Sequence, residues 1–175
     1  MIHPSARIDP SQFPGKNGGE RIQAAIDSLG TMPKVIEIGS QGPDLDGRWF
    51  LTKAIILPSN TTLVLHGARL FLADTVSDNM IRNFDAETDD NSRDENIHIL
   101  GLGGAELDGN AVNQIRQAQV YKNFVIAFHQ VDKASIKGIA LGPTEGWGMG
   151  LENVNDLLVD SIRLQQDGKT ENQDG

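Results

Sequence analysis

The stretch VDKASIKGIALG at residues 131–142 recurs 23 residues later as VNDLLVDSIRLQ at residues 154–165. Both copies alternate apolar and polar side chains on either side of a small residue, which is typical of two short strands joined by a bend. A repeat of this length predicts that successive copies stack as neighbouring parallel strands. The equivalent pairs are Ile136 and Val159, Gly138 and Ser161, Ile139 and Ile162, and Leu141 and Leu164.

Two earlier stretches have the same form, LVLHGARL at residues 63–70 and IHILGLGGAEL at residues 97–107. Aligned on their glycines, these copies lie 34 and 37 residues apart, which fits one repeat plus a loop in each gap. The loops are predicted at 85–95 and 107–123. The alignment makes Leu65, Ile99 and Ile136 equivalent, and likewise Gly67, Gly101 and Gly138.

Further strands are predicted in short apolar runs that begin at Lys34 and are separated by Gly, Pro, Asn and Asp. One amphipathic helix is predicted over residues 20–30, ending near Gly30, with apolar residues at helical spacing. We therefore predict an all-β fold, a right-handed parallel β-helix (solenoid) with an N-terminal capping α-helix. The single domain would span 1–175, with a lead-in at 1–19 and β-helix coils at 34–175. An antiparallel β-sandwich is the alternative, but it does not explain the repeat.

The composition limits the possible partners and cofactors. A net charge of -9 argues against nucleic acid as a partner, because phosphates need a basic surface. The absence of cysteine excludes thiolate metal sites and thiol catalysis. No apolar run approaches the ~20 residues that span a bilayer, so no membrane partner is expected. The start of the chain is unlike a secretion signal, so the protein is expected outside the cell if a signal was removed and otherwise in the bacterial cytoplasm.

The runs ERIQAAIDSLG, KVIEIGS, AIILPSNTTLVLHGARL and NIHILGLGGAELDGN resemble the N-terminal half of pectin-degrading right-handed β-helix proteins. WGMGLENVNDLLVDSIRL and the final NQDG narrow the resemblance to the polygalacturonase-like glycoside hydrolases, family 28. The resemblance covers roughly residues 20 to 175. It implies metal-free, inverting hydrolysis of pectin-type (galacturonan) polysaccharide, with no cofactor.

The resemblance also implies site residues. The family's catalytic Asn-x-Asp-Gly motif matches Asn172, Gln173, Asp174 and Gly175. Asp174 would activate the water that attacks the glycosidic bond, Asn172 would shape the wall of the cleft, and Gln173 would contact the substrate. An inverting hydrolase also needs a carboxylic acid ~6.5–9.5 Å from the water-activating carboxylate. The alternative is that these are turn residues at a polar corner.

Trp147 lies between glycines, where an open indole can stack on a sugar ring. The alternative is that it fills a corner of the fold. The family usually has a histidine three residues after this Trp, where the present sequence has Gly150. The acidic run at 85–95 lacks the spacing of a calcium loop and is predicted to be a solvated loop. No metal site is predicted.

Two other functions remain open: a non-catalytic glycan-binding or phage tailspike-like module, and a calcium-dependent polysaccharide lyase. The family's Asp-Asp pair and its Gly-His-Gly segment have no match before Gly175. We therefore expect the C-terminal coils to be missing and these 175 residues to be inactive alone. We also expect them to self-associate through the exposed last coil.

Overall fold

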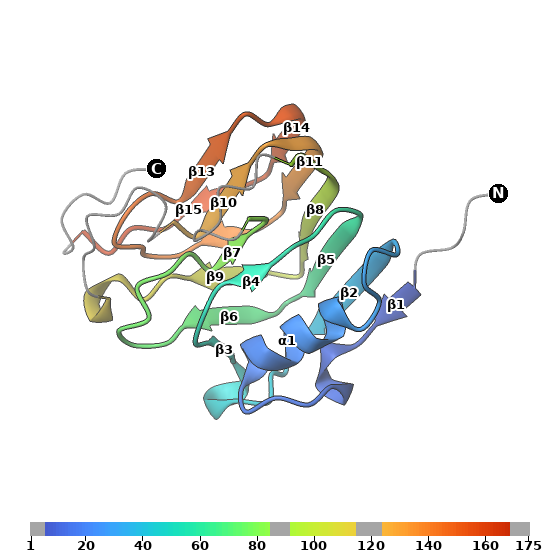
Figure 1. Cartoon of the computed structure of the whole chain (residues 1–175). Helices are drawn as coiled ribbons and strands as arrows, with labels where there is room; N and C mark the ends of the chain where they lie inside the picture. Colours follow the sequence, from blue (N-terminus) through green and yellow to red (C-terminus); the bar gives the residue numbers. More distant parts are fainter. Residues whose placement is uncertain (1–5, 85–91, 115–123, 169–175) are drawn as a thin grey trace.

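The computed structural model describes residues 6–84, 92–114 and 124–168. Its strands form three parallel sheets, and from β2 onward the chain visits the three sheets in turn (Figure 1). Sheet A contains β1 (Ala6–Ile8), β2 (Lys34–Gly39), β5 (Thr61–His66), β8 (Asp94–Leu102), β11 (Val131–Lys137) and β14 (Asn155–Asp160). Sheet B contains β3 (Trp49–Leu51), β6 (Arg69–Leu72), β9 (Glu106–Asp108), β12 (Ala140–Leu141) and β15 (Arg163–Leu164). Sheet C contains β4 (Ile55–Ile56), β7 (Ile81–Arg82), β10 (Ile126–His129) and β13 (Met149–Glu152).

The predicted fold class, an all-β parallel β-helix solenoid, is corrected by this arrangement. The described residues form three separate parallel sheets of six, four and five strands together with a helix, an α/β-type fold. The ladders do not continue from sheet A into sheet B because residues with left-handed backbone, Gly138 (φ 68°) and Ser161 (φ 55°), interrupt them. The runs ASIKGIAL and LLVDSIRL are each divided between sheets A and B, as the prediction of two short strands joined by a bend requires. All strand pairs in the described part of the chain are parallel, which excludes the antiparallel sandwich.

Helix α1 (Gly18–Asp27) begins two residues earlier than predicted because Asn17 caps it. The Asn17 side chain accepts a hydrogen bond from the Glu20 N–H at 3.0 Å, satisfying an N–H that the first turn leaves unpaired. The helix ends at Asp27, ahead of Gly30. Its apolar face is fully buried and packs against β2, β3 and β4. The predicted lead-in at 1–19 also contains β1 and a 3₁₀ turn at Pro10–Gln12.

The observed register confirms the 23-residue repeat. Ile136 pairs with Val159 and Leu141 pairs with Leu164. The equivalence of Ile99 and Ile136 is also confirmed. The equivalence of Leu65 and Ile99 is wrong, since Ile99 pairs with Leu63. A shift of two residues keeps the same side chains facing the core, so the apolar pattern could not detect it.

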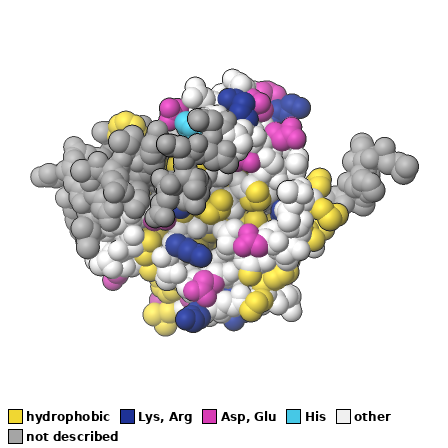
Figure 2. Space-filling model, viewed as in Figure 1, with side chains coloured by type: hydrophobic (Ala, Val, Ile, Leu, Met, Phe, Trp, Pro, Cys, Tyr) yellow, Lys and Arg dark blue, Asp and Glu magenta, His cyan; other side chains and the backbone are white. Residues whose placement is uncertain are grey.

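Among the described residues on the face seen in Figure 2, Lys and Arg side chains are interspersed with Asp and Glu. Two further 3₁₀ turns, Leu45–Gly47 and Ala111–Asn113, lie in the connections between sheets. The core between the three sheets is filled by inward Ile, Leu, Val and Ala side chains and by Trp49.

Candidate functional site

The candidate site is a pocket on the outer face of sheet C, over β10 and β13. In these paired strands Ala127 lies beside Gly150 and His129 beside Glu152, while the alternate residues face the core. The pocket has a volume of about 220 Å³. We call it the sheet C pocket; it is lined by Phe84, Phe124, Ala127, Phe128, His129, Trp147, Gly150, Leu151 and Glu152.

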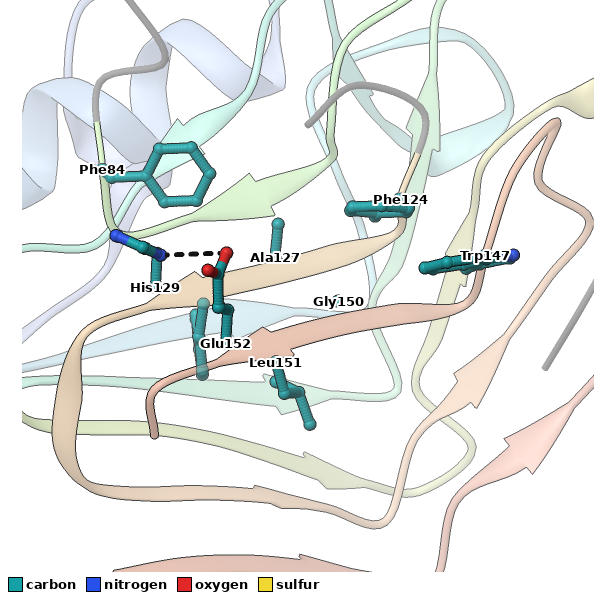
Figure 3. A pocket seen from close by; sticks show the side chains of 9 residues that line it. Phe84, Phe124, Ala127, His129, Trp147, Gly150, Leu151 and Glu152 are labelled. Carbon is teal, nitrogen blue, oxygen red and sulfur yellow. Dashed lines mark ion pairs between the residues drawn. The ribbon is translucent and has the colours of Figure 1, made fainter. Parts of the chain in front are cut away.

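An aromatic pair forms one end of the pocket (Figure 3). The rings of Phe124 and Trp147 are stacked, with centroids 5.5 Å apart and planes 11° from parallel. Trp147 is nevertheless 52% exposed, so it keeps much of its surface open to solvent. Gly150 makes this arrangement possible, because a Cβ there would lie 2.7 Å from Cδ2 of Phe124. The pair thus offers a broad apolar surface at the mouth of the pocket.

An ion pair lies at the other end (Figure 3). Nδ1 of His129 is 3.2 Å from an Oε atom of Glu152. The Phe84 ring meets the imidazole edge to face, with centroids 5.9 Å apart and an interplanar angle of 69°. The Glu152 side chain is 53% exposed, so its carboxylate can accept hydrogen bonds from a ligand.

Two buried asparagines flanking β7 hold β10 in place. The Asn79 side chain accepts a hydrogen bond from the Phe124 N–H at 3.0 Å. The Asn83 side chain accepts from the His129 N–H at 2.8 Å and donates to the His129 carbonyl at 2.9 Å. It also donates to Oδ2 of Asp94. The side chains of Asn79 and Asn83 therefore hold the backbone of Phe124, at the aromatic end of the pocket, and of His129, at its charged end.

A cation, Arg82, lies beside Ala127 in the neighbouring strand of sheet C. Its guanidinium is engaged on several sides: it donates to the Phe84 carbonyl, lies 5.8 Å from the centre of the Phe84 ring and is 3.7 Å from Oδ1 of Asp78. Its side chain is only 13% exposed. Arg82 therefore supports Phe84 from below, while the pocket itself is lined by other residues.

Of the residues predicted for the site, the structure places Trp147 at an open pocket. Asn172, Gln173 and Asp174 lie outside the described residues, as does most of the acidic run at 85–95. Phe124, His129 and Glu152 were missed. The 23-residue offset could have found them, since it places Phe124 on Trp147 and His129 on Glu152.

Within the described residues, no three His, Asp or Glu side chains gather as a metal site. His98 lies on sheet A away from the pocket, with Nδ1 2.9 Å from Oγ of Ser135. Burial, together with the charge of Lys137, lowers the pKa of His98. His98 is therefore a hydrogen-bonded residue of sheet A. None of the helices in the described ranges has the length and apolar character that a membrane span requires.

The comparisons with known proteins show a shared fold. No family model and no curated protein sequence matches the chain. The chain is similar to a crystal structure from Parabacteroides merdae described as "a putative glycosyl hydrolase", with a TM-score of 0.71 and 16% sequence identity. The match covers 95% of this chain and 78% of that one. At this level of identity the likeness shows the arrangement of the chain, and activity has to be argued from the site.

Proposed function

We propose that this protein is a glycoside hydrolase-like protein that binds a polysaccharide chain across the outer face of sheet C. The observation on which this rests is an exposed, preformed aromatic pair next to an accessible carboxylate on one rigid sheet. Flat aromatic surface suits the apolar face of a sugar ring, and a carboxylate suits its hydroxyl groups. The fold shared with a protein described as a glycosyl hydrolase supports the same class.

The size of the pocket suits one ring of a longer chain. Sites that enclose a whole drug-sized ligand have volumes of ≈ 300–1,000 Å³. At about 220 Å³ the sheet C pocket is smaller, so neighbouring sugars would lie on the sheet outside it. We therefore propose a polymeric substrate, with Trp147 and Glu152 contacting one of its residues.

Within this class we propose a pectin-type galacturonan as the substrate and metal-free inverting hydrolysis as the reaction. The motif formed by Asn172, Gln173 and Asp174 supports this by its resemblance to the polygalacturonase-like family. Asp174 would activate water, and an acid ~6.5–9.5 Å away would protonate the leaving oxygen.

The test is release of reducing ends from pectin and polygalacturonic acid, with the anomeric form of the product followed by NMR. We expect any released product to be inverted and unaffected by a chelator, and its release to stop after Asp174→Asn. An unsaturated product lost on chelation would contradict hydrolysis and identify a calcium-dependent lyase.

A non-catalytic glycan-binding module is the second candidate. One observation favours it: Glu152 is the one carboxylate among the described residues that line the sheet C pocket, whereas hydrolysis requires two carboxylic groups. Binding of pectin fragments that Asp174→Asn leaves unchanged, without any release of reducing ends, would favour this function over hydrolysis.

A further inference from the structure

We propose that the protein has a second binding site, a polar cavity on the outer face of sheet A that takes one small uncharged sugar. This inference goes beyond the proposed function, which concerns sheet C. The cavity has a volume of about 340 Å³. We call it the sheet A cavity; it is lined by Asp9, Ser11, Glu37, Gly39, Gln41, Trp49 and His66.

The cavity is open above Gly39, the last residue of β2. A Cβ at this position would have no heavy atom within 4 Å. The indole N–H of Trp49 donates to the Gly39 carbonyl at 2.9 Å, which fixes the backbone here. His66 pairs with Gly39 in the neighbouring strand, and Glu37 lies two residues earlier on the same face of β2. The sheet therefore holds two polar side chains beside an empty position.

The segment ahead of α1 supplies a further wall. The Ser11 N–H donates to Oδ1 of Asp9 at 2.8 Å, which holds the carboxylate at the start of the 3₁₀ turn Pro10–Gln12. Among the described residues, the other carboxylate oxygen of Asp9 has neither a hydrogen bond nor an ion pair. The lead-in therefore places a carboxylate with free acceptor capacity at the cavity.

The side chains that line the cavity have hydrogen-bonding capacity to spare. Glu37 accepts a hydrogen bond from Arg7 and lies 3.8 Å from Nε2 of His66, which is too far for a second one. In the part of the chain that the structure describes, neither the His66 imidazole nor the Gln41 amide makes a hydrogen bond. Carboxylate, amide and imidazole groups together suit sugar hydroxyls, which both donate and accept.

Size and charge narrow the ligand further. Sites that enclose a whole drug-sized ligand have volumes of ≈ 300–1,000 Å³. The sheet A cavity lies at the lower end of this range, which suits a single sugar ring. The carboxylate of a uronic acid would lie close to those of Asp9 and Glu37, and Arg7 is already bonded to Glu37. We therefore expect a neutral sugar to bind more tightly than a uronic acid.

The matched probes are methyl α-D-galactopyranoside and the corresponding methyl galacturonide, which differ only at C6. Each is titrated into the full 175-residue chain while the imidazole signals are followed by NMR, with the His66 signal assigned by His66→Gln. We expect the galactoside to shift the His66 signal to saturation and to bind about fivefold or more tightly than the acid. A His66 signal that the galactoside leaves in place overturns this inference, and so does equal or tighter binding of the acid.

Gly39→Val is the decisive variant, because its side chain extends into the open space. The His66 response to the galactoside should disappear, with circular dichroism confirming the fold. The Trp147 indole signal should still respond to pectin fragments, whose uronates the sheet A cavity disfavours. A His66 response that survives Gly39→Val overturns this inference.

A second pair of variants tests the hydrogen bonds. Gln41→Ala should weaken galactoside binding about threefold or more, since it removes an amide that lines the cavity. Gln166→Ala removes an amide at an exposed position elsewhere and should leave the affinity unchanged. Equal affinities of the two variants overturn the inference. The proposed function stands in each of these cases, because its tests concern sheet C and Asp174.

Discussion

The ring of Phe124 lies so close to Gly150 that a Cβ at Gly150 would approach Cδ2 and Cε2 of the ring to 2.7 and 2.8 Å. This contact places Phe124 where it stacks on Trp147. The shape of the sheet C pocket therefore depends on a residue that has no side chain.

The first prediction is that Gly150→Ala displaces Phe124 and breaks the stack. We expect pectin fragments to bind about tenfold more weakly, a loss of about 1.4 kcal/mol. Overpacking should also destabilise the fold by about 1–3 kcal/mol. Calorimetric titration and thermal melting measure the two effects. The control is Gly39→Ala, because no heavy atom lies within 4 Å of a Cβ built at Gly39; equal effects in both variants would contradict the role of the contact.

The second prediction separates the two tryptophans. Trp147→Ala should weaken sugar binding about tenfold and change the melting temperature little, because the indole is 52% exposed. Trp49→Ala should destabilise the protein by about 3–5 kcal/mol, because Trp49 is 1% exposed and its indole N–H donates to the Gly39 carbonyl. Melting curves and titrations of both variants test this. If the Trp147 variant binds sugar as tightly as the unmodified protein, the indole of Trp147 is not part of the binding surface.

The third prediction concerns Asn83, which bonds to both backbone polar groups of His129. Asn83→Ala should destabilise the fold by about 1–3 kcal/mol, since it leaves a buried N–H without a partner. It should also weaken binding by releasing His129 and Glu152 from their positions. The control is Asn155→Ala, which removes an exposed bond to Asp132 and should have a small effect. An Asn83→Ala variant with the same free energy of unfolding and the same ligand affinity as the unmodified protein would contradict this role.

The fourth prediction is a pH dependence of stability at Asp108. Burial raises the pKa of this carboxyl above its usual value of 3.8, and the nearby Glu106 adds to the effect. The folded state therefore favours the protonated form. The protonated Asp108 carboxyl therefore contributes to the stability of the fold. This contribution is fully present below pH 3.8 and is lost as the pH rises through the higher pKa of the folded state.

Asp108→Asn removes this titration and can keep the hydrogen bond from the Asn110 N–H, which Oδ1 of Asp108 accepts at 2.8 Å. We expect the variant to melt at a higher temperature than the unmodified protein at pH 7, with the difference vanishing toward pH 3.5. A lower melting temperature at pH 7 would show that the ionised carboxylate stabilises the fold.

The sequence predicted the strand pairing correctly where no loop is inserted between two copies of the repeat. Ile136 and Val159 pair as the 23-residue period predicts. The pairing of Ile99 was misplaced by two residues, because a loop of unknown length separates it from the earlier copy and the inward pattern has a period of two. The fold class was wrong because the apolar alternation indicates which side chains face the core, and does not determine where each ladder ends.

The site was only partly predictable. Trp147, which lines the sheet C pocket, was singled out because an aromatic residue between glycines is conspicuous in the sequence. The partner of Glu152 was missed because His129 belongs to no motif, and only the 23-residue offset, which places His129 on Glu152, could have indicated the pair. The role of Gly150 could not be predicted from the sequence, because it depends on where the Phe124 ring lies. That position depends in turn on Asn79, just ahead of β7, which accepts a hydrogen bond from the Phe124 N–H.

Two indole N–H signals report whether the outer face of sheet C binds a sugar chain. The chain has two tryptophans, so each signal can be assigned with one substitution, such as Trp147→Phe. On titration with pectin fragments, we expect the Trp147 signal to shift and saturate while the signal of the buried Trp49 stays in place. A Trp147 signal that does not move at saturating ligand would contradict the account.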